Sequence, residues 1–351
     1  MDIKKLFEEA RKQKCSDLHI TAGTALATRR FGELKVLEGK NDYIPTIEES
    51  EAMILSMLTN EQRAHVMAGN DLDVGTMLED GSRIRANVYH QRNHLAASIR
   101  LLEGVIPTLD ELGFPKSIEE LSELPSGLVL VTGPTGCGKS TTLASMIEHI
   151  NHTQKRHIIT IEDPIEYIFL HEKAMIHQRE VGKDVVDFAT ALRSALREDP
   201  DVIMVGEMRD YETISAAITA AETGHLVLAT LHTTSAAQTV ERIIDGCPID
   251  VQNQIRTQLA NVLRAVITQR LIRREDGEGR VAASELLLNN NAVSNLIRDN
   301  KVFQIPNTIQ SNLSNGMYSL NYDLIRLVKS RVITVEQAKR YSPAPNELSR
   351  L

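Results

Sequence analysis

Cysteine is scarce in this sequence of 351 residues: Cys15, Cys137 and Cys247 lie far apart and form no CxxC pair. A structural zinc module needs four ligands in closely spaced pairs, so this spacing excludes a recognisable one and predicts free thiols in a reducing compartment. The chain also lacks an apolar run of about 18 residues, the length of a membrane span, and an apolar signal-peptide stretch near its start. We therefore expect a cytoplasmic protein with no direct membrane span.

Dense blocks of Lys and Arg are also missing. The chain has 39 Lys and Arg against 47 Asp and Glu, which gives a formal net charge of −8. Because nonspecific nucleic-acid binding requires a concentrated positive surface, this balance argues against a nucleic-acid partner. Apolar residues make up 42% of the chain, enough for two cores at the usual domain size of about 100–200 residues.

The sequence pattern divides the chain into two parts. Residues 1–105 begin with an amphipathic helix and continue with short strands and two helical segments, including a hairpin with its turn at Asp80-Gly81, which is typical of an α+β module. From Leu128 onward strands alternate with helices, which predicts an α/β domain with a mostly parallel sheet over 106–351. Proline and glycine near Gly104–Pro107 place the boundary there and make this segment a candidate hinge.

The sequence pattern predicts a mainly helical structure for the last third of the chain. The pattern predicts helices after about Gln269, with a C-terminal helical region over about 285–351. Residues 342–347 contain two prolines among polar residues, and we expect them to be disordered.

A glycine-rich segment with the pattern GxxxxGKS lies between a predicted strand, 127–132, and a predicted helix. Its backbone N–H groups and the helix N-terminus can surround phosphates, Lys139 can reach the β- and γ-phosphates, and Ser140 can ligate Mg²⁺. The sequence therefore predicts a site for ATP and Mg²⁺, against the alternative of a glycine-rich turn with no ligand. The residues of this P-loop are Gly133, Pro134, Thr135, Gly136, Cys137, Gly138, Lys139, Ser140 and Thr141.

Two further predicted strands end in carboxylates. The apolar run 202–205 leads to Glu207, where an acid acts on the Mg²⁺ side of an ATPase site. The strand 158–161 leads to Glu162, Asp163 and Glu166, at the sheet edge where open α/β sheets bind ligands. One of these three is a candidate base for activating water, and capping of a helix or loop is the alternative interpretation.

Histidines flank the next predicted strand, His225 before residues 226–231 and His232 after them. A histidine near the γ-phosphate can sense its loss through a hydrogen bond, whereas the alternative is a side chain packed at the strand end. Arginine from a neighbouring subunit can stabilise a transferring phosphate, although most surface arginines are solvated charges. The candidates are Arg83, Arg85, Arg92, Arg193 and Arg197.

Taken together, these segments resemble the secretion-superfamily ATPases, and within them the PilT-type motors that retract type IV pili. The resemblance covers roughly residues 1–340. It rests on 133–141, 161–166, 191–201, 205–210 and 221–232, together with the N-terminal segments 16–23 and 83–87.

The resemblance implies a PAS-like N-terminal domain, a RecA-like ATPase domain and a homohexameric ring. It assigns water activation to Glu166, the Walker B role to Glu207 and a histidine box to His225 and His232. It raises Arg83 and Arg85 as arginine fingers. It further implies an inner-membrane pilus platform protein as partner and peripheral association with that membrane. A paralogous retraction ATPase is a further candidate partner.

One departure from the family pattern concerns the C-terminal segment. The family reads AIRNLIRE where this chain has Ala292–Asp299, so Ser294 replaces an arginine in a segment linked to retraction rather than hydrolysis. A pilus-assembly or type II secretion ATPase is the nearest alternative, but its zinc insertion needs four cysteines. A nucleotide-gated scaffold without turnover is a second alternative, and the presence of both Glu166 and Glu207 argues against it. A small-molecule P-loop kinase is a third, and the ring-ATPase motifs do not support it.

Overall fold

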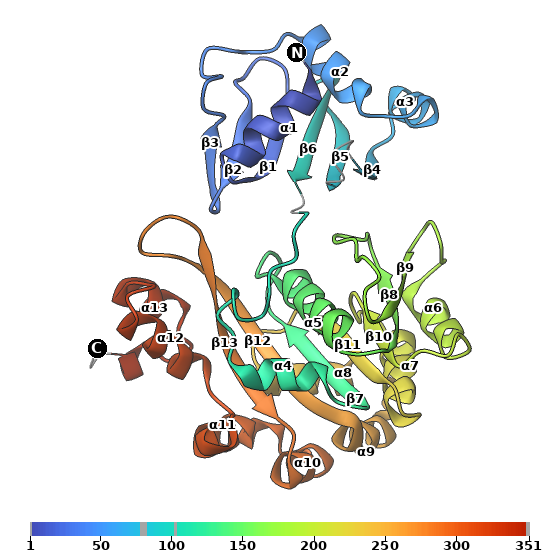
Figure 1. Ribbon diagram of the computed structural model, residues 1–351, viewed down its shortest axis with the longest axis vertical. Coiled ribbons are helices and arrows are strands. Elements are labelled where there is room, and N and C mark those ends of the chain that lie inside the picture. Colours follow the sequence, from blue (N-terminus) through green and yellow to red (C-terminus); the bar gives the residue numbers. More distant parts are fainter. Residues whose placement is uncertain (1, 78–82, 102–103, 349–351) are drawn as a thin grey trace. The chain divides into compact units, whose positions relative to one another are not determined.

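The computed structural model describes residues 2–77, 83–101 and 104–348, and the chain forms two compact units, Met1–Val105 and Ile106–Leu351. Each unit has its own sheet (Figure 1). Among the described residues, no helix combines the length and apolarity that crossing a membrane requires. The predicted turn at Asp80-Gly81 lies outside the described residues.

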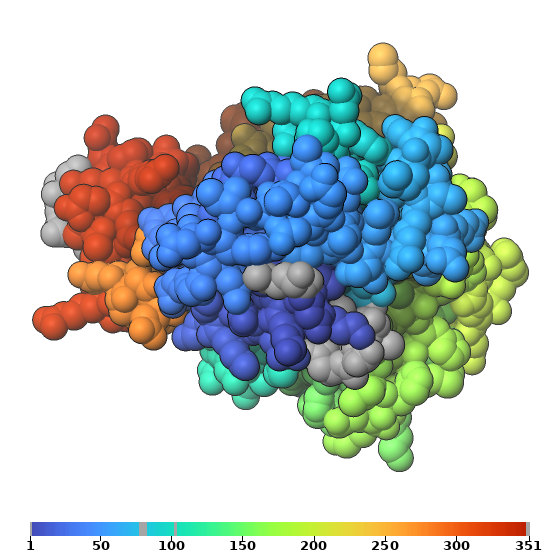
Figure 2. All heavy atoms as spheres, turned by 90° about the horizontal axis from the view of Figure 1, so that it is seen from above, coloured from blue at the N-terminus to red at the C-terminus, as the bar shows by residue number. Residues whose placement is uncertain are grey.

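The N-terminal unit is built on a six-stranded antiparallel sheet in the order β3-β2-β1-β6-β5-β4. Leu6 and Phe7 of α1 and Ile54 of α2 pack into its core, whereas α3 buries only Val66. The light blue atoms of α2 and α3 accordingly lie on the outer surface of this unit in Figure 2. Its elements are α1 (Ile3–Lys12), β1 (Cys15–Ile20), β2 (Ala27–Arg30), β3 (Glu33–Val36), α2 (Ile47–Ser56), α3 (Asn60–Met67), β4 (Leu72–Met77), β5 (Arg83–Gln91) and β6 (His94–Leu101).

The second unit contains a seven-stranded sheet in the order β13-β12-β7-β11-β10-β8-β9. All neighbouring strands are parallel except β12 and β13, so the carboxyl ends of six strands lie at one edge. The strands are β7 (Gly127–Thr132), β8 (His157–Glu162), β9 (Met175–Glu180), β10 (Val202–Val205), β11 (Leu226–Leu231), β12 (Leu263–Arg273) and β13 (Arg280–Leu288).

Helices cover both faces of this sheet (Figure 1). Successive side chains of a strand point to opposite faces, so Ile203 and Val205 of β10 enter one core and Val202 and Met204 the other. The result is the three-layer α/β fold with a parallel sheet that the sequence predicts. One face carries α4 (Lys116–Ser122) and α5 (Lys139–Thr153), and the other carries α6 (Phe188–Ala195), α7 (Tyr211–Glu222), α8 (Ala236–Asp245), α9 (Gln252–Val262) and α10 (Asn291–Arg298).

The helical interpretation after Gln269 was wrong as far as Leu288. Residues 263–288 form the β12–β13 hairpin, paired from Ala265 with Leu288 to Arg273 with Arg280. Both faces of β12 are covered, so its apolar residues run together and lack the alternation that marks a strand. Helices resume beyond the hairpin: α10, η1 (Val302–Gln304), α11 (Ile305–Ser311), η2 (Leu313–Asn315), α12 (Leu320–Lys329) and α13 (Val335–Tyr341).

The expectation of disorder over 342–347 was also wrong. A 3-10 turn, η3 (Pro345–Leu348), packs the fully buried Leu348 against α12, α13 and the β12–β13 hairpin. Asn321 donates from Nδ2 to Glu347 Oε2 at 2.6 Å and so fastens the segment to α12. Asn321 also donates to Ala344 O at 3.3 Å and accepts from Ser342 Oγ at 2.7 Å. Composition missed this order because the segment is held by contacts with α12, which is distant in the sequence, and not by its own apolar content.

Candidate nucleotide-binding site

Four polar segments meet at the carboxyl edge of the parallel sheet. The P-loop follows β7, His232 follows β11, Glu207 follows β10, and the segment with Glu166 follows β8. Because these strands are parallel neighbours in the order β7-β11-β10-β8, the segments lie side by side. The fold therefore brings together groups that the chain separates by up to 99 residues, from Gly133 to His232.

Lys139 is folded back over the P-loop. Gly138, at a left-handed φ of 92°, precedes α5 and turns the chain into it, so Lys139 is the first residue of the helix. Its Nζ donates to the carbonyl oxygens of Gly133 at 3.0 Å and Pro134 at 3.2 Å. Burial lowers the pKa of Lys139, and the nearby charges of Glu207 and Glu166 act in the opposite direction. A phosphate would offer this ammonium a stronger acceptor than either carbonyl.

His232 bridges Lys139 and Glu207. Lys139 Nζ lies 3.5 Å from His232 Nδ1, and His232 Nε2 lies 3.3 Å from Glu207 Oε2. An ammonium only donates and a carboxylate only accepts, so a neutral imidazole with its proton on Nε2 satisfies both contacts. Arg209 pairs with the other carboxylate oxygen of Glu207. Both oxygens of this carboxylate are therefore engaged at the site.

Backbone contacts with two flanking strands fix the loop that carries Glu207. Gly206 N–H donates to Ile161 O of β8 at 2.8 Å, and Met208 N–H donates to Thr230 O of β11 at 3.1 Å. Glu207 lies between these two anchors and is mostly buried, with 14% of its side chain exposed. The sheet therefore holds the backbone at Glu207 on both sides.

The three carboxylates at the end of β8 and just after it occupy different environments. Glu162 is buried and accepts hydrogen bonds from Thr160 at 2.6 Å and Gln178 at 3.1 Å. Burial raises the pKa of Glu162. Asp163 is exposed, whereas Glu166 is partly buried and close enough to Lys139 to influence its pKa. Of the three, Glu166 is the carboxylate whose charge acts on Lys139.

We call residues 163–172, which follow β8 and carry Glu166, the acidic segment. Its first part is fastened to β9 and to α5. Ile165 N–H donates to Glu180 at 3.2 Å, and Phe169 N–H donates to Gln178 at 3.0 Å. The hydroxyl of Tyr167 lies 3.0 Å from that of Thr141 in the first turn of α5. The segment that carries Glu166 is thus tied to the P-loop helix itself.

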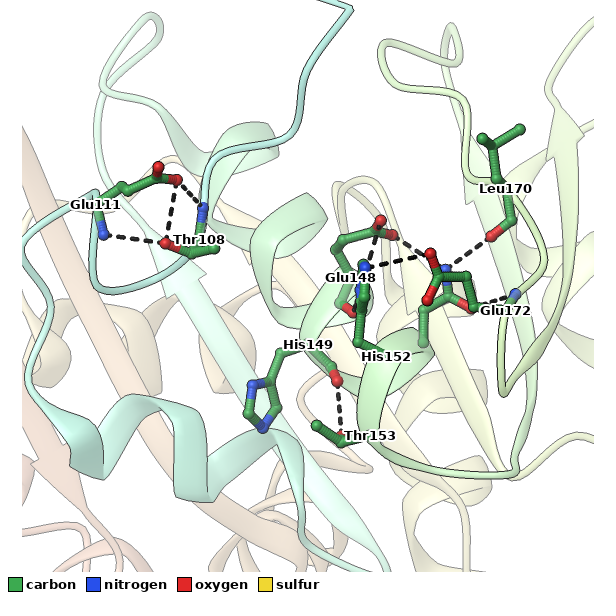
Figure 3. Close-up of polar contacts among 9 residues, drawn as sticks. Thr108, Glu111, Glu148, His149, His152, Thr153, Leu170 and Glu172 are labelled. Atoms are coloured by element: carbon green, nitrogen blue, oxygen red, sulfur yellow. Dashed lines mark hydrogen bonds and ion pairs between the residues drawn. The ribbon is translucent and has the colours of Figure 1, made fainter.

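The far end of this segment is fastened to the last turn of α5, as Figure 3 shows. Asn151 donates to Leu170 O at 2.7 Å and accepts from Glu172 N–H at 3.1 Å. His152 lies 3.3 Å from Glu172 and 3.6 Å from Glu148. With both ends held, the position of Glu166 follows that of α5.

His225 is not brought to the P-loop of its own chain. It lies at the start of β11, at the edge of the sheet opposite to the carboxyl ends, and β11 has six residues, a length of about 20 Å. Its Nδ1 lies 2.9 Å from Ala220 O at the end of α7. The geometry matches the alternative of a histidine packed at a strand start.

Arg83 and Arg85 belong to the N-terminal unit. They alternate with buried Ile84 and Ala86 on β5, so both side chains lie on the face of that sheet opposite to the core. Arg92 follows the same strand, at a left-handed φ of 49°. These arginines belong to a different unit from the P-loop.

The donor set at the site fits Mg²⁺. Ser140 presents an exposed hydroxyl at the start of α5, and Glu207 supplies carboxylate oxygens. Mg²⁺ prefers oxygen ligands, keeps several waters and is usually held by one or two protein groups together with substrate phosphates. In the described ranges no cluster of three or more His, Cys, Asp or Glu could hold a metal alone. Such a cluster is not required by an ion that arrives with a nucleotide.

Known proteins resemble the chain over its whole length. A family model described as "Type II/IV secretion system protein" matches residues 1–338. The type IV pilus retraction ATPase PilT of Pseudomonas aeruginosa is 43% identical over 347 residues, which cover 98% of this chain and 99% of that protein. The chain belongs to this secretion-protein family.

Two further similar proteins support the same family assignment. A twitching motility protein of Neisseria gonorrhoeae is 46% identical over 302 residues, or 86% of this chain and 81% of that protein. A crystal structure of the pilus retraction motor PilT with bound ADP superposes with a TM-score of 0.87 at 46% identity, over 100% of both chains. The family resemblance and the RecA-like fold are therefore confirmed.

Some residues at this site escaped the sequence analysis. Gln178 and Glu180 hold the acidic segment, and on β12 the buried Gln269 contacts Cys137 of the P-loop while its neighbour Thr268 contacts Thr132 at the end of β7. The sequence does carry a signal for the second pair, because three polar residues, Thr268, Gln269 and Arg270, interrupt the apolar run 265–272. Buried polar side chains in a central strand need partners, and the nearest polar backbone is the P-loop.

Proposed function

We propose that this protein is an ATP-hydrolysing motor that retracts type IV pili. The observation that carries the proposal is the arrangement of Lys139, His232, Glu207 and Glu166 around a P-loop at one sheet edge. The names of its relatives, a pilus retraction ATPase and a twitching motility protein, support the biological role. The ADP bound to the similar PilT structure supports a nucleotide ligand.

In this proposal the P-loop amides and Lys139 bind the phosphates, and Glu166 accepts a proton from the attacking water. The water oxygen then forms a bond to the γ-phosphorus while the bond to the β–γ bridging oxygen breaks, and ADP leaves. His232 connects Lys139 to Glu207 and responds to the loss of the γ-phosphate. Bound through Ser140 and Glu207, Mg²⁺ would neutralise charge on the phosphate oxygens.

We further propose a homohexameric ring in which Arg83 or Arg85 acts on the nucleotide of a neighbouring subunit. Both arginines belong to the N-terminal unit and not to the unit that carries the P-loop, and in ring-forming ATPases an arginine that acts on the phosphates can come from a neighbouring subunit. Mixing an Arg85→Ala variant with a Lys139→Ala variant should restore some intact interfaces and some activity. A fully active monomer in solution would reject both the ring and the arginine finger.

We propose that two parts of the chain transmit the conformational change that follows ATP hydrolysis. They are the segment between the two units, residues 104–107, and helix α10. Residues 104–107 form no helix or strand, and the Thr108–Glu111 cap, drawn in Figure 3, begins the next ordered turn. In α10, Ser294 donates to Ala260 O of α9 at 2.9 Å. This serine therefore fills the place of the family arginine with a helix-to-helix contact. The exposed side of α10 would contact an inner-membrane pilus platform protein. The motor would then lie at the periphery of that membrane. A paralogous retraction ATPase would be a further partner.

Steady-state phosphate release from Mg-ATP by the purified protein tests the enzymatic part of the proposal. We expect turnover in the wild type and its loss in Lys139→Ala, because the ammonium is replaced by a methyl group. Bound ADP without turnover would instead favour the nucleotide-gated scaffold. Turnover with more surface pili in cells would favour a pilus-assembly ATPase.

A further inference from the structure

Strand β12 forms one wall of the P-loop. It runs parallel to β7, with Thr268 opposite Thr132 at the point where β7 ends and the P-loop begins. The hydroxyls of Thr132 and Thr268 lie 2.9 Å apart, and both are buried. The next residue, Gln269, is 1% exposed. A side chain with four hydrogen-bonding positions in such a place needs partners.

Gln269 finds its partners in the P-loop and in the first turn of α5. Its Nε2 donates to Cys137 O at 2.7 Å, and its Oε1 accepts from Thr142 Oγ1 at 3.0 Å. A carbonyl oxygen only accepts, so the nitrogen of the amide must face Cys137. Both ends of the Gln269 amide are therefore engaged, and its orientation is fixed.

The contact with Cys137 determines where the next amide points. In a planar trans peptide the carbonyl and the following N–H point in opposite directions. Because the Cys137 carbonyl points to Gln269, the N–H of Gly138 points away from β12. Gly138 is also the residue before α5, where unpaired N–H groups of a helix start form an anion site.

The backbone is packed too closely for this wall to move freely. A Cβ on Gly133 would lie 2.4 Å from Gln269 O, and a Cβ on Gly138 would lie 3.2 Å from Gln269 Nε2. The glycines of the P-loop thus allow close contact with Gln269 as well as with a phosphate. The wall and the loop form one unit.

We propose that Gln269 is a positioning residue that holds the Cys137–Gly138 peptide with its N–H directed into the phosphate cradle before nucleotide binds. The inference rests on the proposed nucleotide-binding role of the P-loop. Gln269 touches no reacting atom. Its effect is to present a phosphate-binding amide in advance, so that binding does not have to reorient the peptide.

The test uses Gln269→Leu with Thr268→Val as the matched control. The first removes the contacts to Cys137 and Thr142. The second removes the neighbouring buried hydrogen bond to Thr132, which does not involve the 137–138 peptide. We expect Gln269→Leu to weaken ADP binding and raise the KM for ATP by about tenfold or more, the effect of losing one hydrogen bond to a charged group. Its kcat should stay within about threefold, because the amide contacts substrate and transition state alike.

A second variant separates the hydrogen bond from the charge and from folding. In Gln269→Glu at pH 8 the carboxylate opposes the Cys137 carbonyl, so ADP affinity should fall below that of Gln269→Leu. On acidification the buried carboxyl becomes protonated and regains a donor, because burial raises a carboxyl pKa. Its affinity at pH 5.5 should then exceed that of Gln269→Leu, whereas neutralising a charge alone would only make the two equal.

ADP titration of the whole protein measures the affinity of each variant, and thermal unfolding in parallel shows whether each variant folds. Wild-type affinity in Gln269→Leu, or an equal loss in Thr268→Val, would overturn the proposal. If Gln269→Leu does not fold, Gln269→Glu at the two pH values is compared with Thr268→Val, and no recovery on acidification would overturn it. Failure of the wild type to bind ADP would instead contradict the proposed function.

Discussion

Replacing Glu166 with glutamine removes one proton acceptor and little else. The acidic segment is held by the backbone N–H groups of Ile165 and Phe169 and by the hydroxyl of Tyr167. None of these contacts involves the Glu166 carboxylate. The amide of glutamine has nearly the same shape but does not accept a proton, so the variant should fold normally and bind ADP as the wild type does.

The expected loss in kcat for Glu166→Gln is about 10² to 10⁴, the usual contribution of a positioned acid or base. At about 1.36 kcal/mol for each factor of ten, this corresponds to about 2.7 to 5.4 kcal/mol in the barrier. Asp163→Asn is the matched control, because this carboxylate belongs to the same segment but is exposed. It should keep kcat within about threefold.

Phosphate release under saturating Mg-ATP measures both variants, with ADP binding as the check on the site. A Glu166→Gln enzyme with kcat within threefold of the wild type would refute the assignment of the base. A larger loss in Asp163→Asn than in Glu166→Gln would move the role to the neighbouring carboxylate.

Three further predictions concern the rest of the second unit. His232→Ala removes the bridge between Lys139 and Glu207 and should lower kcat about tenfold or more in the phosphate-release assay, while ADP affinity changes by less than threefold. Glu285 accepts from Ala236 N–H at 2.8 Å, and burial raises its pKa, so the folded state loses stability as pH rises above the unfolded value of about 4.3. Glu285→Gln, which cannot ionise, should therefore raise Tm at pH 7.5, and this gap should close below pH 4 in thermal unfolding; an equal gap at both pH values would contradict this. Leu296→Ala and Arg298→Ala should leave ATPase rates within about twofold yet reduce pilus retraction, and a proportional loss of both would place α10 in the catalytic core.

The sequence was most informative where function restricts it. The P-loop, the strand-end acid Glu207 and His232 were recognisable because each follows a short apolar run, and parallel strands bring such ends to one edge. The β12–β13 hairpin was missed because a strand buried on both faces loses its alternation. This error also hid Gln269, whose role depends on where β12 lies and not on any local pattern.

The carboxylates at the end of β8 and just after it show the same limit at the level of single residues. All three are acids within one short segment of the sequence, and only burial distinguishes them. Glu162 points into the protein toward Thr160 and Gln178, whereas Glu166 lies near Lys139. Gln178 belongs to β9, which the sequence analysis did not recognise, so the distinction required the fold.

Pilus retraction in living cells tests the central claim most directly. A strain that lacks its own retraction ATPase would carry either this protein or its Glu166→Gln variant, and the retraction speed of single pili would be measured in an optical trap. The account predicts retraction with the wild-type chain and none with Glu166→Gln, although both proteins bind ADP. An absence of retraction with a wild-type chain that hydrolyses ATP at full rate would contradict it.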